Sequence, residues 1–153
     1  LTVKLLKEDV NKVALSIVPC IPLGHSFGRL GCLFAGCCYG SEYNGFLAVL
    51  LNINGTVVST FPIQAVEAAL NLFLFFGLVC IASRIKKGVL LLPIYLYAYS
   101  AIRFCLEFFR GDSVRGMLFG LSTSQWICIV IALVCTIYLI TQKTIKRKRI
   151  QHI

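Results

Sequence analysis

The chain has 153 residues, of which 58% are hydrophobic and only 14% are charged. Soluble domains of this size rarely carry so little charge, whereas proteins with several membrane spans do. The net charge of +9 at pH 7 does not indicate a nucleic-acid partner, because the lysines form three clusters that flank apolar segments, the pattern of a positive-inside membrane protein. The clusters are Lys4, Lys7 and Lys12; Lys86 and Lys87; and Lys143, Lys146 and Lys148.

The apolar runs predict an all-α membrane protein in which residues 1–153 form a single transmembrane domain. We expect four spans, at about residues 13–38, 64–83, 89–109 and 124–140. Pro19 and Pro22 are expected to break or kink the first span near its middle. The chain begins with Leu1 and a charged stretch, so we expect it to be the C-terminal part of a longer protein.

The connections between the spans carry turn and capping signals. Asn54-Gly55 lies between two apolar, β-branched runs within residues 41–63, which predicts a small β-hairpin. Ser122 and Gln125 fit a capping box that opens the fourth span. The basic clusters predict a cytoplasmic C-terminus, which would place the hairpin on the outer surface of the membrane.

The most unusual stretch covers residues 24–40, where an apolar run contains polar side chains and five glycines. In a helix, His25, Arg29 and Cys32 fall at i, i+4 and i+7 and therefore share one face. Two small-xxx-small pairs are expected to let neighbouring helices approach closely: Gly24 with Gly28, and Gly36 with Gly40.

Two further spans carry polar stripes, which are Gln64, Glu67 and Asn71 on the second and Tyr95, Tyr99, Arg103 and Glu107 on the third. One interpretation is a structural network that pairs Arg103 with Glu107 and Arg29 with Glu67, because ionisable groups inside a membrane need partners. The other is a cavity open to the outer leaflet, in which Arg29 and Arg103 bind the phosphate of a lipid or another anion. A guanidinium group suits this task because it donates two parallel hydrogen bonds.

The eight cysteines do not predict a disulfide framework, because five of them are scattered through apolar runs and are interpreted as small apolar residues. These five are Cys20, Cys80, Cys105, Cys128 and Cys135. The other three, with His25, match no standard metal-binding spacing, so no metal site is predicted. A disulfide among Cys32, Cys37 and Cys38 remains open. For His25, the roles of proton carrier and of satisfied polar group remain equally open.

Four motifs resemble those of bacterial prolipoprotein diacylglyceryl transferases. Residues 28–40 resemble the family pattern Gly-Arg-x-Gly-Asn-Phe-x-Asn-Gly-Glu-x-x-Gly without a gap, and residues 61–67 are similar to His-Pro-x-Gln-Leu-Tyr-Glu. Residues 99–110 resemble Tyr-x-x-x-Arg-Phe-x-x-Glu-Phe-x-Arg, and residues 121–126 resemble the Ser-x-Ser-Gln opening of the last helix. The order of the motifs matches as well, and the resemblance covers residues of about 20–140.

The resemblance implies an enzyme of the bacterial cell membrane that uses no cofactor. It would transfer a diacylglyceryl group from phosphatidylglycerol to the lipobox cysteine of a prolipoprotein, with membrane lipids and the prolipoprotein signal peptide as partners. The implied catalytic residues are Arg29 and Arg103, which would hold the phosphate, and Tyr99 and Glu107, which would orient them. The implied substrate-binding residues are His25, Gln64, Glu67, Gly40 and Arg110.

Three departures from the family pattern bear on activity. Cys32 and Cys37 stand where the first motif has Asn and Glu, and Phe61 stands where the second has His. The family's earlier block, which carries a histidine, has no counterpart in the chain. Two alternatives therefore remain: a non-catalytic or differently specific membrane protein that binds an anionic lipid, and a thiol-redox membrane protein that uses Cys37 and Cys38.

Overall fold

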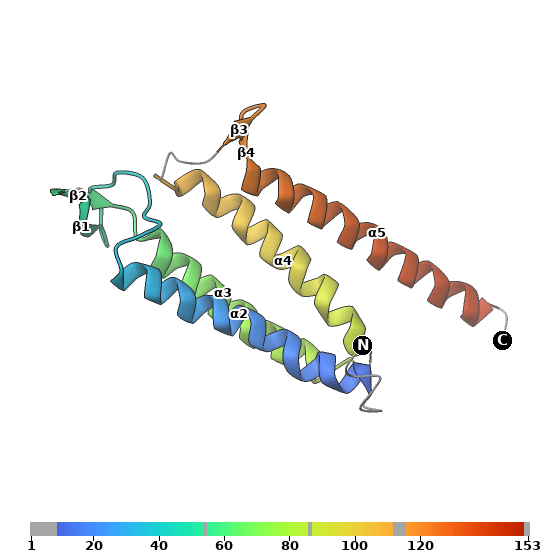
Figure 1. The fold of residues 1–153 in the computed structure, drawn as a ribbon. Helices are drawn as coiled ribbons and strands as arrows, with labels where there is room; N and C mark the ends of the chain where they lie inside the picture. Colours follow the sequence, from blue (N-terminus) through green and yellow to red (C-terminus); the bar gives the residue numbers. More distant parts are fainter. Residues whose placement is uncertain (1–8, 54, 86, 112–115, 152–153) are drawn as a thin grey trace.

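The structure of the chain, a computed structural model, describes residues 9–53, 55–85, 87–111 and 116–151. Four long helices run alternately up and down, so that the start of the first, the connection between the second and third, and the end of the fourth lie at one end (Figure 1). The helices are α2 (Val10–Phe34), α3 (Ile63–Ala82), α4 (Leu91–Leu106) and α5 (Thr123–Gln151). Short 3₁₀ turns, η1 (Gly88–Leu90) and η2 (Glu107–Phe109), flank α4.

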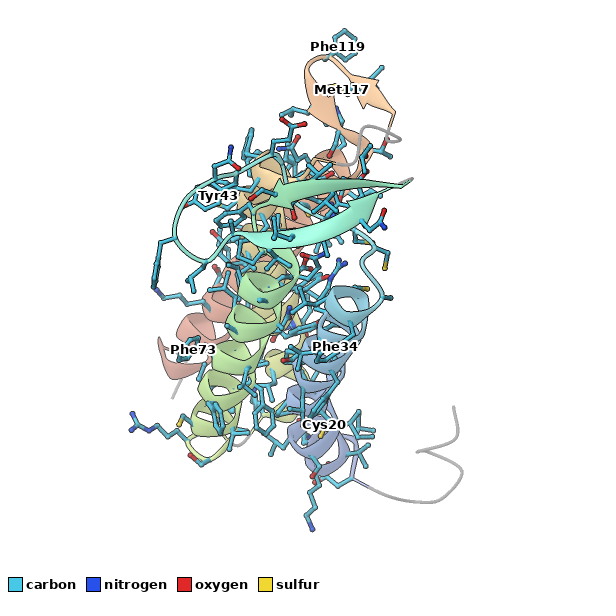
Figure 2. The ribbon with its side chains drawn as sticks, turned by 90° about the vertical axis from the view of Figure 1, so that its left-hand side faces the viewer. Cys20, Phe34, Tyr43, Phe73, Met117 and Phe119 are labelled. Atoms are coloured by element: carbon cyan, nitrogen blue, oxygen red, sulfur yellow. The ribbon has the colours of Figure 1, made fainter. Side chains whose placement is uncertain are left out.

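Among the described residues, four segments are long and apolar enough to cross a membrane, which confirms the predicted all-α membrane fold: Val10–Phe34, Ile63–Ala82, Gly88–Phe109 and Thr123–Thr144. Large apolar side chains such as Phe34 and Phe73 point outward from the helices, where a bilayer would surround them (Figure 2). Of the two outcomes expected at Pro19 and Pro22, a break is absent because α2 continues through both prolines, and a kink stays a prediction.

Helix α2 ends at Phe34, four residues before the predicted end of the first span. The backbone N–H groups of Gly36 and Cys37 donate to the carbonyl oxygens of Leu33 and Cys32, at 3.2 and 3.1 Å. Gly36 has φ +66°, so these bonds form a Schellman motif with glycine in the left-handed position. The prediction that Gly36 and Gly40 form a helix-packing pair is therefore wrong, because both follow the end of the helix.

The predicted hairpin is confirmed by β1 (Val49–Ile53) and β2 (Thr56–Thr60), which pair antiparallel with Ile53 opposite Thr56. Gly55 occupies the turn with φ +87°, and its N–H donates to Asn52 Oδ1 at 3.0 Å. Asn54, the other residue of the predicted turn, lies outside the described residues. The hairpin covers the end of the bundle at which α2 ends and α3 begins (Figure 1).

A second, unpredicted hairpin pairs β3 (Met117–Leu118) with β4 (Leu121–Ser122) just before α5. Both turn residues, Phe119 and Gly120, have positive φ, which matches the twist of a two-residue hairpin. Met117 and Phe119 point away from the bundle at its tip (Figure 2). Trp126 of α5 anchors this hairpin, because its indole N–H donates to the Leu118 carbonyl at 2.9 Å.

The predicted capping box at the start of α5 is confirmed. The Gln125 backbone N–H donates to Ser122 Oγ at 3.2 Å, and the Ser122 N–H donates to Gln125 Oε1 at 2.9 Å. Both residues are buried, so the two reciprocal bonds satisfy N–H groups that α5 itself leaves unpaired.

Candidate active site

A cavity of about 330 Å³ lies beside the face of α2 that carries the predicted polar stripe. His25, Arg29 and Cys32 all line it, which confirms that the i, i+4, i+7 spacing places them on one face. Tyr99 of α4 contributes the opposite wall. The cavity therefore lies between α2 and α4 and is lined by a guanidinium, an imidazole, a phenol and a thiol.

Gly24 and Gly28 complete the cavity lining. A Cβ built on either glycine would meet no heavy atom of the described chain within 4 Å, beyond its own helix backbone and chain neighbours. The prediction that this pair brings two helices into close contact is therefore wrong for the described structure. The missing side chains instead leave the cavity wide at its α2 side.

Four ionised side chains form a continuous chain behind the cavity. Arg29 Nε lies 3.0 Å from Glu67 Oε1, and Arg103 Nη1 lies 3.7 Å from Glu67 Oε2. Arg103 Nη2 lies 2.7 Å from Glu107 Oε2, one helical turn further along. Both pairs of the predicted structural network are thus present. Glu67 is additionally shared by both arginines, so the network links α2, α3 and α4.

The two arginines differ in what they offer a ligand. The Arg29 side chain is 21% exposed and lines the cavity, and its ion pair with Glu67 uses Nε, so the two Nη atoms remain for other partners. Arg103 is only 10% exposed and is absent from the cavity lining. Its Nη1 is buried without a hydrogen-bond partner among the described residues. Arg29 is therefore the directly accessible cation, and Arg103 stands behind Glu67.

Helix α3 presents its predicted polar stripe to the interior, where Gln64, Glu67 and Asn71 are all buried. Gln64 Nε2 donates to the Cys37 carbonyl at 2.9 Å and so ties the loop after α2 to α3. Asn71 Nδ2 donates to the Glu67 carbonyl at 2.8 Å, within the same helix. Of the three, only Glu67 contacts the arginines, and Gln64 acts on the loop backbone.

A buried serine, which the sequence analysis did not single out, pins α2 to α3. Ser26 Oγ donates to the Ala68 carbonyl at 2.8 Å. Ser26 directly follows His25 in the sequence, and Ala68 directly follows Glu67. Membrane helices commonly use serine in this way, because a hydroxyl can bond across a close helix contact. Its position between His25 and Arg29 was the sequence feature that could have indicated this role, but serines are too common in such helices to be recognised by pattern alone.

His25 contacts the aromatic side chains of α4. Tyr95 Oη lies 3.3 Å from His25 Nδ1, and the His25 and Tyr99 rings have centroids 5.0 Å apart. Tyr95 and Tyr99 stack on each other at 5.8 Å. The imidazole therefore has a polar partner and also reaches the cavity, so both roles considered for it from the sequence are compatible with its position.

Gly40 and Arg110 meet where two loops cross at the hairpin end of the bundle. The two residues form an antiparallel β-bridge, and the Ser41 N–H donates to the Phe109 carbonyl at 2.9 Å. A Cβ on Gly40 would collide with the carbonyl oxygen of Phe61 and make a tight contact with that of Phe109. Gly40 is therefore required by backbone packing, and it places Arg110 near the loop that follows α2.

Arg110 acts on the thiols of that loop. Burial of the Cys38 thiol opposes its ionisation, but a hydrogen bond from Arg110 and the positive charges of Arg110 and Arg29 outweigh this effect and lower the pKa of Cys38. The pKa of Cys37 is raised instead, chiefly by its hydrogen bond with Cys32 and by desolvation. Adjacent thiols thus differ in their tendency to ionise.

Comparison with known proteins identifies the family. The family model described as prolipoprotein diacylglyceryl transferase matches residues 2–141, most of the chain. The chain belongs to this family. The arginines, carboxylates and tyrosine of the candidate site all lie within the matched residues. No solved structure shows a significant match to the chain.

Curated relatives carry the name phosphatidylglycerol–prolipoprotein diacylglyceryl transferase. Enzyme 2 of this name from Clostridium perfringens is 34% identical over 128 residues, which are 82% of this chain and 50% of the relative. The Clostridium tetani protein is 33% identical, covering 79% of this chain and 49% of the relative. The Helicobacter hepaticus protein is 33% identical, covering 86% and 48%. The chain spans about half the length of these relatives, and with its four apolar helices it is a multi-pass membrane protein.

Proposed function

We propose that the protein transfers a diacylglyceryl group from phosphatidylglycerol to the lipobox cysteine of a prolipoprotein. In this reaction the thiol sulfur bonds to the glyceryl carbon, and the bond between that carbon and the phosphate oxygen breaks. Glycerol phosphate leaves with the bonding electron pair, and the thiol proton is released. The family and the names of the relatives support this reaction, and the candidate site has groups suited to the leaving phosphate.

The observation that carries the proposal is the position of Arg29. A guanidinium at membrane depth costs about 2.5–3.5 kcal/mol on insertion scales. The ion pair with Glu67 offsets part of this cost, and binding of an anion would explain why the group also lines a cavity. The carboxylate of Glu67, 3.0 Å from Nε, holds the guanidinium beside the cavity by charge, without a hydrogen bond to Oε1 among the described residues. The two Nη atoms can then form the paired hydrogen bonds that suit a phosphate. Preorganised charge of this kind stabilises a leaving anion without further rearrangement.

The other assigned residues support this arginine in the proposed mechanism. Arg103 adds positive charge from behind Glu67, and its unpartnered Nη1 is a spare donor. Glu107 orients Arg103, and Tyr99 offers its hydroxyl at the cavity wall. Substrate contacts are assigned to His25 and Glu67 inside the site, and to Gln64, Gly40 and Arg110, which hold the loop at its rim.

The proposed topology gives this site access to the outer leaflet. With the basic C-terminus in the cytoplasm, both hairpins and the loop crossing would lie on the outer side, where a prolipoprotein signal peptide meets the membrane. The chain would act as a single transmembrane domain embedded among membrane lipids. Accessibility of a cysteine-specific label at an introduced Phe119→Cys, on the tip of the second hairpin, tests this orientation.

The decisive experiment uses purified protein in phosphatidylglycerol vesicles with a synthetic lipobox peptide, and follows the mass of the thioether-linked product. Arg29→Ala should lower the rate about 100-fold to 1000-fold, the usual cost of removing one preorganised donor. Arg29→Lys should recover part of this loss, because lysine keeps the positive charge but lacks the two parallel N–H donors of a guanidinium. Arg84→Ala, an exposed arginine at the other end of the bundle, is the matched control. Unchanged rates in both Arg29→Ala and Arg103→Ala would refute the proposal.

A second candidate is a protein that binds an anionic lipid without turnover. The observation in its favour is that Glu67 and Glu107 already pair with the two arginines, which leaves less positive charge to stabilise a departing phosphate than to hold a lipid headgroup at Arg29. The same vesicle assay distinguishes the two, because this protein would bind phosphatidylglycerol and yield no thioether product. Arg29→Ala would then weaken lipid binding. The third reading, a thiol-redox protein, would show a Cys37–Cys38 pair that cycles between thiol and disulfide forms.

A further inference from the structure

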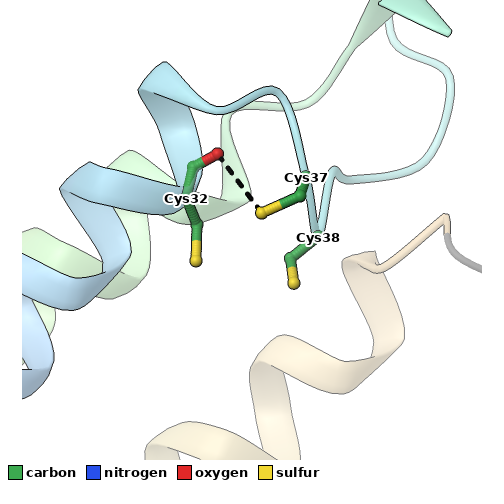
Figure 3. Close-up of side chains that lie close together, drawn as sticks. All are labelled: Cys32, Cys37 and Cys38. Atoms are coloured by element: carbon green, nitrogen blue, oxygen red, sulfur yellow. Dashed lines mark hydrogen bonds between the residues drawn. The ribbon is translucent and has the colours of Figure 1, made fainter.

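One cluster of reactive side chains has no part in the mechanism proposed above. The Sγ atoms of Cys32, Cys37 and Cys38 all lie within 4.8 Å of one another. Figure 3 shows that Cys32 comes from the last turns of α2 and the other two from the loop that follows, with all three side chains converging. All three are free thiols in the structure.

The backbone at the end of α2 brings these thiols together. The Schellman motif joins the Cys37 N–H to the Cys32 carbonyl at 3.1 Å, and Cys37 Sγ lies 3.7 Å from the same oxygen. Gln64 holds the Cys37 carbonyl from α3. Cys38 adopts φ +58°, a left-handed conformation that costs a non-glycine residue of the order of 1–3 kcal/mol. The loop is thus held in a strained form that turns Cys38 toward its neighbours.

We propose that Cys32, Cys37 and Cys38 form a three-thiolate site for one soft metal ion, Cu⁺ or Zn²⁺, at the rim of the cavity. Thiolates are the ligands that select these ions. With metal–sulfur bonds of about 2.3 Å, three sulfurs around one ion lie about 4.0 Å apart, so only a small contraction is needed. Cu⁺ is satisfied by three thiolates, whereas Zn²⁺ takes a fourth ligand, such as water.

The charges around the cluster suit such a complex. Three thiolates with Zn²⁺ carry a net charge of −1, and with Cu⁺ they carry −2. Arg110 bonds to Cys38, and Arg29 lies close enough to affect its charge, so two cations face the cluster. Binding requires that the three thiols lose their protons. The spacing of the cysteines alone gave no hint of this site, because only the helix end brings the three together.

An ion in this site would influence the neighbouring cavity. Cys32 is itself part of the cavity lining, one helical turn from Arg29. The ion would link the end of α2 to the loop that crosses Arg110, and so would hold the rim of the cavity in one conformation. The inference concerns binding of the ion and does not depend on the transferase reaction.

The test uses the purified full chain in detergent, reduced and kept free of oxygen, and adds Cu⁺ or Zn²⁺ in competition with a chelator of known affinity. One ion should remain bound per chain after gel filtration, and Cu⁺ should produce ultraviolet thiolate-to-metal absorption. The ion should protect Cys32, Cys37 and Cys38 from alkylation, but should leave Cys80 reactive, which is exposed in the last turn of α3. This measurement needs no variant, so it does not depend on how a substituted protein folds.

Variants then assign the ligands. Cys32→Ser, Cys37→Ser and Cys38→Ser should each weaken binding at least about tenfold, a loss that even outer-shell changes cause in metal sites. Cys20→Ser and Cys105→Ser, at thiols outside the cluster, should bind as the unsubstituted protein does. Equal affinity in all five variants would overturn the proposal. So would a disulfide between two of the three cysteines in protein isolated without reductant, if no ion is retained after reduction.

Discussion

The two ends of the α2–α3–α4 bundle are built on different principles. At the end away from the hairpins, Val18, Leu78, Leu91 and Tyr95 form a buried apolar cluster. At the hairpin end, the same helices meet through the ion pairs of Glu67 and the hydrogen bond of Ser26. Tyr95 marks the boundary, because it packs in the apolar cluster and contacts His25.

This difference shows which contacts specify the fold in a membrane. Lipid tails are as apolar as a leucine side chain, so the apolar end gains packing but little hydrophobic driving force. Placing a charged group in contact with lipid costs far more free energy than placing a leucine there. The polar end therefore strongly favours the one helix arrangement that pairs its charged groups. The polar end should therefore contribute more to the choice of helix partners.

The largest expected effect comes from Glu67→Gln. This change removes the carboxylate that Arg29 and Arg103 share and leaves two guanidiniums with less compensation. Breaking one side of a buried ion pair costs about 3–5 kcal/mol, because the remaining charge stays buried. Thermal unfolding in detergent micelles should therefore show a clearly lower midpoint, or the variant should fail to accumulate in the membrane.

Leu78→Ala is the matched change at the apolar end, where Leu78 is fully buried. In soluble proteins such a truncation costs about 2–5 kcal/mol, partly through the loss of hydrophobic transfer. In a bilayer the contribution of hydrophobic transfer is small, so we expect a smaller loss of stability for Leu78→Ala than for Glu67→Gln. A larger loss for Leu78→Ala would reverse the comparison and make the apolar end the main determinant.

A smaller effect is expected at the loop crossing, from Gly40→Ala. The added methyl group would collide with the Phe61 carbonyl oxygen and crowd that of Phe109, and backbone atoms cannot move aside as a flexible side chain would. Overpacking of this kind costs about 1–3 kcal/mol. The loop should loosen and become more sensitive to protease, while the helices remain assembled. Gly55→Ala probes a different property, since its Cβ would meet open space but its φ of +87° is unfavourable.

The smallest effect is a shift in reactivity at the hairpin end. Because Arg110 lowers the pKa of Cys38, the thiolate should form, and react with iodoacetamide, at lower pH than that of Cys37, whose pKa is raised. Arg110→Gln removes the stabilising charge, so the pKa of Cys38 should rise and its reaction profile should move to higher pH. Site-resolved mass spectrometry measures both cysteines in one sample. An unchanged Cys38 profile would contradict the assigned role of Arg110.

The sequence predicted the spans and several local features because each depends on a short-range signal. Long apolar runs predict membrane helices, Asn54-Gly55 a hairpin, and Ser122 with Gln125 a capping box. The ion pair between Arg103 and Glu107 is likewise local, since the two residues lie one turn apart. Regular spacing along one helix was also sufficient to place His25, Arg29 and Cys32 on the cavity wall.

The sequence could not predict features that depend on where chain segments meet. The sharing of Glu67 by two arginines requires the relative rotation of three helices, which no local pattern encodes. The end of α2 was misplaced because Gly36 has two possible roles. In a continuing helix it serves packing, and in a Schellman motif it serves termination. That second role also brings the three thiols together.

Arg29 and Arg103 share the Glu67 carboxylate, so an anion bound in the cavity beside α2 would also affect Arg103 on α4. An anion that bonds to the two Nη atoms of Arg29 leaves Nε beside Glu67 but neutralises part of the guanidinium charge, so Arg103 becomes the stronger cationic partner of Glu67. The longer of the two ion pairs, 3.7 Å between Arg103 Nη1 and Glu67 Oε2, would shorten in response. A ligand on α2 would thereby be sensed on α4 through a redistribution of charge among three side chains, without any movement of the helices themselves.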